Sequence, residues 1–191
     1  GDKDYYVRGT FTKHNLDFAK DAVHMAELGF DQVSVEPVVS DPKLPYSLQE
    51  EDLPAAFAEY ENLANILIDR KKKGKGFNFF HFMIDLNQGP CAIKRLRGCG
   101  CGNEYVCVTP EGDIYPCHQF VGEEKWKMGN IMEDTFDIPM KQEFALTNVY
   151  SKEDCKDCWA KFYCSGGCAA NSWQYEGNIL KSHKLSCDLE K

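Results

Sequence analysis

The first ninety residues of this 191-residue chain contain no cysteine, although the whole chain contains ten. That part of the chain therefore cannot hold a thiolate-ligated metal centre. The sequence also lacks a charged-then-apolar segment at its start and any apolar run long enough to span a bilayer. These absences predict a soluble, cytoplasmic protein without a membrane partner.

Positive charge is also scarce. The 22 Lys and Arg residues are outnumbered by 30 Asp and Glu residues, which gives a net charge of −8 and a pI near 5.1. Affinity for nucleic acid depends on clustered Lys and Arg side chains. The one basic run, at residues 70–75, falls at the expected end of a helix, where it complements the helix dipole. We therefore expect no nucleic-acid partner.

The first half of the chain alternates strand-like and helix-like patterns. Strands are predicted at 5–11, 32–39 and 77–86, and the last of these is apolar enough to be buried on both faces. Helices are predicted from Asn15 to residue 28 and after a capping box formed by Ser47 and Glu50. This order is typical of a parallel sheet or of part of a β/α barrel. An α/β fold is therefore expected, with residues 1–90 as the C-terminal portion of a partial β/α barrel.

The second half of the chain is rich in cysteine and poor in regular patterns. A β-hairpin is predicted from strands at 105–109 and 113–117, with Gly112 supplying the positive φ of the turn. Helices are plausible near 138–146 and 168–175. Because so little regular structure is expected, metal ligation is predicted to take the place of a large core. Residues 91–191 are thus expected to form a small, irregular, cysteine-rich domain.

Seven cysteines of this half follow a distinct spacing: Cys99, Cys117, a CxxCxxxxxCxxxC run over 155–168, and Cys187. A structural zinc takes four ligands and a [4Fe–4S] cluster takes up to four thiolates, so seven or eight cysteines indicate two clusters. Tight CxxC pairs without a secretion signal favour metal ligation over disulfides. The alternative is zinc, in a zinc-stapled interaction module.

This spacing resembles the SPASM domain, the auxiliary-cluster module at the C-terminus of many radical S-adenosylmethionine (SAM) peptide-modifying enzymes. The resemblance extends to SVEPVV (34–39), FFHFMIDLNQGPC (79–91), GCGCGNEYVCVTPEGDIYPCHQFVGEE (98–124) and CWAKFYCSGGCAAN (158–171). These segments are similar to those of the maturases of six-cysteine-in-forty-five (SCIFF) peptides. The resemblance covers essentially the whole chain.

The resemblance implies two auxiliary [4Fe–4S] clusters with interleaved ligands. It assigns an inner cluster to Cys99, Cys117 and Cys168, with Cys91 as a candidate fourth ligand. It assigns an outer cluster to Cys155, Cys158, Cys164 and Cys187. Two cysteines fall off the pattern: Cys101 is a rival to Cys99, and Cys107 is expected to pack as a small side chain in the hairpin.

The resemblance also implies what the chain does not carry. Radical SAM enzymes hold a further [4Fe–4S] cluster, which cleaves SAM, on a CxxxCxxC motif, and no cysteine precedes Cys91. We therefore expect the chain to be the C-terminal part of a longer maturase and to be inactive alone. In the full-length enzyme a SAM-derived radical would abstract hydrogen from a cysteine-rich, ribosomally made precursor peptide. A peptide cysteine would then bond to that carbon, commonly joining Cys to Thr by a thioether, with electrons exchanged with an external donor.

Two charged residues stand at the ends of predicted strands. Arg8 and Glu36 could face the SAM pocket, because ligands of β/α barrels bind at the carboxyl ends of the strands. Alternatively, Arg8 pairs with a carboxylate and Glu36 is a solvated or capping group. His81 is predicted to be a hydrogen-bonded core residue. A different radical SAM–SPASM enzyme, such as an anaerobic sulfatase maturase, would share the cluster domain and act on another peptide residue.

Overall fold

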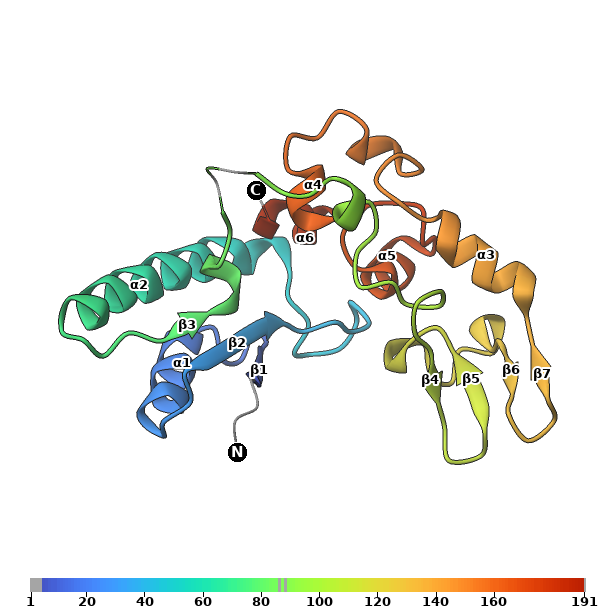
Figure 1. Ribbon diagram of the computed structural model, residues 1–191, viewed down its shortest axis with the longest axis horizontal. Helices are drawn as coiled ribbons and strands as arrows, with labels where there is room; N and C mark the ends of the chain where they lie inside the picture. Colours follow the sequence, from blue (N-terminus) through green and yellow to red (C-terminus); the bar gives the residue numbers. More distant parts are fainter. Residues whose placement is uncertain (1–4, 86, 88, 191) are drawn as a thin grey trace. The chain divides into compact units, whose positions relative to one another are not determined.

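The computed structural model describes residues 5–85, 87 and 89–190. The chain divides into two compact units, Gly1–Gly89 and Pro90–Lys191. The first unit runs from blue to green in Figure 1, and the second runs from green to red. No helix in the described ranges is both long enough and apolar enough to cross a membrane.

The first unit is built on a three-stranded parallel sheet in the order β1-β2-β3 (Figure 1). Its elements are β1 (Val7–Phe11), α1 (Phe18–Glu27), β2 (Gln32–Pro37), η1 (Glu50–Asp52), α2 (Leu53–Lys72), β3 (Asn78–Phe79) and η2 (Phe80–Phe82). Each pair of neighbouring strands is joined through a helix, as parallel strands require. The expectation of an α/β fold is confirmed.

Apolar side chains on one face of the sheet pack against the helix α1. Val33 and Val35 are fully buried, and the backbone at Gly9 lies beside Val35 and the α1 residue Met25. Phe11 stacks on Phe18 of α1, with ring centroids 4.5 Å apart. Because successive strand residues point to opposite faces, this packing leaves alternate β2 positions, including Glu36, on the other face.

The predicted strand at 77–86 is wrong in extent. Only Asn78 and Phe79 pair with β2, and the chain then enters the 3₁₀ turn η2. The side chains of Phe80, Met83 and Ile84 are 52%, 54% and 51% exposed. An apolar run predicts burial only where another element covers it, and among the described residues 77–85 only Phe79 is fully buried. Residue 86, the end of the predicted strand, lies outside the described residues.

Both predicted helix caps also differ. The side chain of Asn15 accepts the Thr12 N–H at 2.8 Å, so it holds the turn before α1, which begins at Phe18. The capping box lies at Gln49, whose main-chain N–H donates to Asp52 Oδ2 at 2.9 Å. Ser47 instead donates to the Asp41 carbonyl. The capping box differs from the predicted one because the 3₁₀ turn η1 precedes α2, and the box forms at the start of η1.

The second unit contains a four-stranded antiparallel sheet of very short strands, in the order β4-β5-β6-β7 (Figure 1). These strands are β4 (Cys107–Val108), β5 (Asp113–Tyr115), β6 (Gly129–Asn130) and β7 (Thr135–Phe136). The predicted hairpin is β4–β5, and Gly112 has a φ of +90° in its turn, as expected. The strands β6 and β7 are too short to leave a periodic pattern, and the sequence did not predict them.

Helical segments complete the second unit. They are η3 (Ile93–Arg95), η4 (His118–Phe120), η5 (Glu124–Trp126), α3 (Ile138–Leu146), η6 (Glu153–Cys155), α4 (Lys161–Cys164), α5 (Ala169–Glu176) and α6 (Lys184–Glu190). The helix predicted at 138–146 is confirmed, and Asp137 caps it by accepting the Met140 N–H at 2.8 Å. The helix predicted near 168–175 corresponds to α5.

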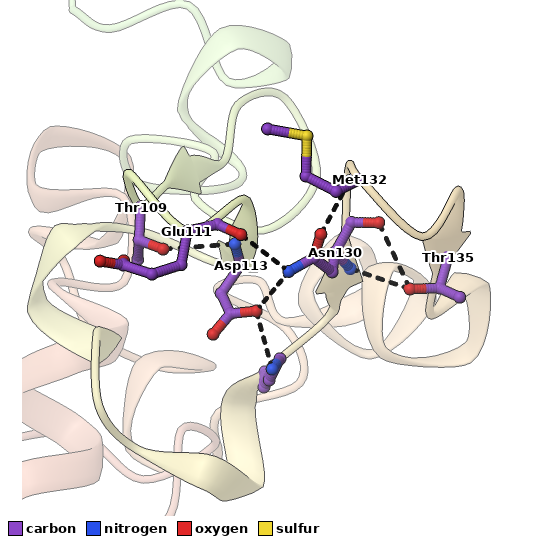
Figure 2. Close-up of polar contacts among 7 residues, drawn as sticks. Thr109, Glu111, Asp113, Asn130, Met132 and Thr135 are labelled. Carbon is purple, nitrogen blue, oxygen red and sulfur yellow. Dashed lines mark hydrogen bonds and ion pairs between the residues drawn. The ribbon is translucent and has the colours of Figure 1, made fainter.

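Asn130 joins the two hairpins of this sheet (Figure 2). Its side-chain amide donates to the Glu111 carbonyl at 3.1 Å and to Asp113 Oδ1 at 2.7 Å. Its side-chain oxygen accepts the Met132 N–H at 2.7 Å. Asn130 is only 8% exposed, so its side chain is buried at one end of each of these part-buried bonds. One side chain thus fixes the turn that precedes β5, the strand that leads to Cys117.

An aromatic core holds the sheet and the helices of this unit together. Trp126 is 2% exposed, and its ring lies 5.3 Å from that of Phe144 on α3 and 5.2 Å from that of Trp173 on α5. Phe120 packs edge-on against Trp126 and Phe144. Such pairs contribute about 0.5–1.5 kcal/mol each beyond the burial of their area.

Candidate metal centre

A tight loop brings two cysteines toward a third. The Gly102 N–H donates to the carbonyls of Tyr105 and Pro116, both at 3.0 Å. The first bond closes the loop on itself, and the second ties it to the residue before Cys117. Cys101 adjoins Gly102, so its side chain lies beside Cys117.

Three thiols of this region are in contact. The Cys101 thiol lies within hydrogen-bonding contact of both Cys99 and Cys117. Cys99 Sγ is also 3.4 Å from Tyr105 Oη. Cys117 and Cys101 are buried, whereas Cys99 is exposed. The group is therefore reachable from solvent at its Cys99 end.

The hydrogen bonds in this group favour thiolate. A hydrogen bond from Cys101 and a second from Tyr105 lower the pKa of Cys99 to about 5, against the opposing effect of burial. The bond from Cys101 also lowers the pKa of Cys117. The pKa of Cys101 itself is raised by these same bonds to its two neighbours. Thiolates are the form that binds metal, so two of the three thiols are predisposed to ligate.

Cys168 approaches the same group from the C-terminal part of the chain. The Gly98 backbone lies so close to the Gly167 carbonyl that a Cβ there would be 2.9 Å from its oxygen. The charges of Cys99 and Cys117 accordingly act on Cys168, whose pKa is raised mainly by burial. A small hollow opens between the two segments, lined by Cys99 and Cys101 on one side and residues 165–167 and Ala169 on the other.

The structure thus brings Cys99, Cys117 and Cys168 near one another, with Cys101 beside Cys99 and Cys117. We name these four residues the inner group. Cys91, the candidate fourth ligand, is exposed, and it is Cys101 whose thiol contacts Cys99 and Cys117. The sequence signal for this loop is the run GCGCG, because glycines on both sides of a cysteine permit a tight turn.

Four more cysteines gather separately. The pKa of Cys155 is raised by its burial and further by the charges of Cys164, Cys187 and Cys158. Cys155 ends η6, Cys164 ends α4, and Cys187 lies in α6, so three short helices position these thiols. We name Cys155, Cys158, Cys164 and Cys187 the outer group. Cys107 lies apart, half-buried on β4 opposite Tyr115.

The donor set fits iron–sulfur clusters. None of the ten cysteines, all of which lie in the described residues, forms a disulfide, and eight of them fall into two groups of four, the number that a [4Fe–4S] cluster takes. Across residues 5–85, 87 and 89–190, no three Cys, His, Asp or Glu side chains converge tightly enough to hold a single metal ion. A cluster carries its thiolates on separate irons, so its ligands need not converge on one point.

A second polar site lies at the carboxyl ends of the strands in the first unit. Ser34 donates to one oxygen of Glu36, and His81 Nε2 lies 2.8 Å from the other oxygen. His81 Nδ1 in turn lies 2.9 Å from Tyr60 Oη on α2. His81 is therefore hydrogen-bonded, as predicted, but it is half-buried at a strand end rather than enclosed in the core.

Opposing effects act on Glu36. Burial alone would raise its pKa, but hydrogen bonds from His81 and Ser34 and the charges of His81 and Arg8 lower it overall. Arg8 is exposed and is the second residue of β1, in register with Ser34 on β2, so the prediction that it stands at the end of its strand is wrong. Strand alternation therefore puts Arg8, Ser34 and Glu36 on one face of the sheet. The sequence could have indicated Ser34 as a site residue, because residues two apart on a strand share a face with each other. No local pattern indicates Tyr60, because it comes from the helix α2.

Comparison with protein families identifies the cysteine-rich region. The family model of the SPASM domain, an iron–sulfur cluster-binding domain, matches residues 99–159. An uncharacterised protein of Archaeoglobus fulgidus is 26% identical over 98 residues, which are 50% of this chain and 23% of that protein.

Solved structures of anSMEcpe resemble the chain over nearly its whole length. Native anSMEcpe with bound AdoMet matches with a TM-score of 0.69 and 20% identity, over 98% of this chain and 53% of that one. Native anSMEcpe with bound AdoMet and Cp18Cys peptide matches with a TM-score of 0.67 and 20% identity, over 98% and 54%. The chain thus spans about half the length of these structures. Residues 99–159 match the SPASM iron–sulfur cluster-binding domain, and the chain shares its fold with a SAM-binding protein.

Proposed function

We propose that this chain is the auxiliary-cluster part of a radical SAM peptide maturase that forms a thioether, joining Cys to Thr, in a cysteine-rich precursor peptide. The observation that carries the proposal is the gathering of eight cysteines without disulfides into an inner and an outer group, in a chain with a SPASM match. The fold shared with anSMEcpe, which binds AdoMet and has been solved with a peptide, supports the same reaction class.

The proposed reaction needs an electron acceptor. Replacing a C–H bond and an S–H bond by one C–S bond removes a hydrogen atom, a proton and an electron from the peptide. Two bound [4Fe–4S] clusters would supply sites for that electron on its way to an external carrier. Residues of this chain would hold them: the inner group beside the hollow, and the outer group among η6, α4 and α6.

Within the inner group, Cys99 is the exposed member and has the lowered pKa. Tyr105 and Cys101 would hold it as thiolate. We propose that Cys101, rather than the exposed Cys91, completes this ligand set, because Cys101 contacts two of the other members.

The strand-end site of the first unit would contribute to SAM binding. Arg8 and Glu36 lie on one face of the sheet, with Glu36 near the carboxyl end of β2 and Arg8 nearer the amino end of β1. Ser34 and His81 hold the Glu36 carboxylate in place, so that it could accept hydrogen bonds from ligand hydroxyls. Ligands of α/β folds generally bind at this end of the strands.

A sulfatase-maturase-like enzyme is the second candidate. The likeness to anSMEcpe favours it as much as the thioether reaction, because both would use the same cluster domain on a peptide. A zinc-stapled interaction module is the remaining alternative, and it would use the same thiols without acid-labile sulfide.

Metal and sulfide analysis tests the cluster proposal. We expect about eight irons and eight sulfides per chain after anaerobic purification and reconstitution, with broad visible absorption. The C187S variant should lose about half of this iron, whereas C107S should lose none, because Cys107 lies outside both groups. One or two zinc ions without sulfide, persisting after reconstitution, would contradict the proposal.

Peptide chemistry then separates the two enzymes. In the full-length enzyme, a thioether product loses two hydrogens and one alkylatable thiol but gives no carbonyl derivative. A sulfatase-maturase-like product would instead react with a hydrazine reagent. Product that reacts as an aldehyde would reject the thioether assignment and retain the radical SAM class.

A further inference from the structure

Lys152 is the most deeply buried charged residue near the two cysteine groups. It is only 2% exposed, although Lys side chains are rarely buried unless they are paired. Its ammonium group donates to the Gly166 carbonyl at 2.8 Å and to Ser172 Oγ at 3.2 Å. Both acceptors are neutral, so neither cancels the charge.

The position of Lys152 is fixed relative to ligands from both groups. The Lys152 carbonyl accepts the Cys155 N–H at 3.1 Å, which ties it to the outer group. Gly166 lies between Cys164 and Cys168, and Ser172 is one turn beyond Cys168 on α5. Lys152 also lines the hollow beside Cys99. The ammonium group is thus enclosed by the segments that present the thiols.

A buried cation needs nearby negative charge. An uncompensated ammonium group loses its hydration on burial, at a cost of several kcal/mol in real proteins. Burial does lower the pKa of Lys152, while the charges of Cys155, Cys168, Cys187 and Cys164 act in the opposite sense. Thiolate-ligated clusters are anionic, so their presence would compensate Lys152 and explain its place.

We propose that Lys152 is a positioning residue that raises the reduction potential of the outer cluster through its buried positive charge. The inference rests on the proposed cluster function. Reduction adds one electron to a cluster, and a cation in a poorly hydrated site stabilises that added charge strongly. The Lys152 carbonyl is hydrogen-bonded to the N–H of the outer ligand Cys155, and Cys155 is also the thiol whose charge acts most strongly on Lys152, so the outer cluster is affected more. Electrons from the inner group would then move outward more favourably.

The test is an EPR-monitored redox titration of the reconstituted chain, with a C99S/C117S background to assign the outer signal. In K152M and K152Q, we expect the outer midpoint to fall by at least 59 mV, which is tenfold in the one-electron equilibrium. K152R keeps the charge and should stay near the wild type. K156M is the matched control, because Lys156 is half-exposed and already pairs with Glu153.

Each outcome decides the inference. An unchanged potential in cluster-loaded K152M or K152Q, or the same fall in K152R, would overturn it. If K152M and K152Q both fail to bind a cluster that K152R binds, the inference is supported, because positive charge is the property that Arg has and that both Met and Gln lack. Failure of all three would overturn it in favour of a packing role. Absence of iron and sulfide in the wild type would instead reject the proposed function itself.

Discussion

The glycine between Cys101 and the hairpin offers the sharpest test of how the inner group is built. Gly102 has a φ of +74°, and a Cβ at this position would lie 2.5 Å from Cγ of Phe144, a core residue that is 3% exposed. A left-handed alanine costs about 1–2 kcal/mol. Overpacking against a fixed ring adds about 1–3 kcal/mol. We therefore expect G102A to lower the free energy of unfolding by about 2–5 kcal/mol.

Gly177 provides the matched control. Its φ is +65°, at the C-terminal cap of α5, and nothing lies within 4 Å of the position that a Cβ would take there. G177A therefore carries the backbone cost of about 1–2 kcal/mol without the clash. The difference between the two variants isolates the contact with Phe144.

Urea unfolding followed by tryptophan fluorescence measures this difference. Trp126, Trp159 and Trp173 are the three tryptophans of the chain, so the signal reports on the second unit alone. At a slope near 2 kcal/mol per molar urea, G102A should lower the midpoint by about 1–2.5 M and G177A by about 0.5–1 M. Equal midpoints for the two variants would refute the argument from close packing at Phe144.

The remaining predictions concern the hydrogen bonds of Asn130, the carboxylate of Glu36 and the bound iron. N130A should lower the stability of the second unit by about 2–3 kcal/mol, because it removes three part-buried side-chain hydrogen bonds; a loss below about 0.5 kcal/mol in the same urea assay would contradict this. The folded-state pKa of Glu36 is lowered from 4.5, so its stabilising effect should be complete above that pH and be lost as pH falls below it. Hydrogen exchange of peptides from residues 5–85 should show this loss in the wild type and not in E36Q. Chelation of bound iron should lower the stability of residues 90–190 far more than that of residues 5–85, and equal protection of both units after chelation would refute the structural role of the metal.

The sequence was a good guide wherever a local rule decides the structure. The helix α3 lies at the predicted residues, and its start carries local signals, because Asp137 caps it and Pro139 stands in its first turn. The β4–β5 hairpin was predictable from the turn chemistry around Gly112. The third strand was not, because the run after Phe79 carries the composition of a buried strand while only two residues find a neighbouring strand. Backbone pairing at that point depends on what lies beside the chain, which composition does not record.

The side chains that shape the sites are harder to read than the cysteines. Spacing pointed to seven of the eight thiols that the structure gathers, because covalent proximity constrains CxxC pairs and short runs, whereas Cys101 fell off the pattern. Lys152 and Tyr60 carry no such signal: each acts through partners 14 or more residues away. A lysine three residues before Cys155 resembles any surface lysine until the fold buries it. Sequence therefore indicates which atoms could hold a cluster, whereas the charge that would set its potential depends on long-range packing that only the structure records.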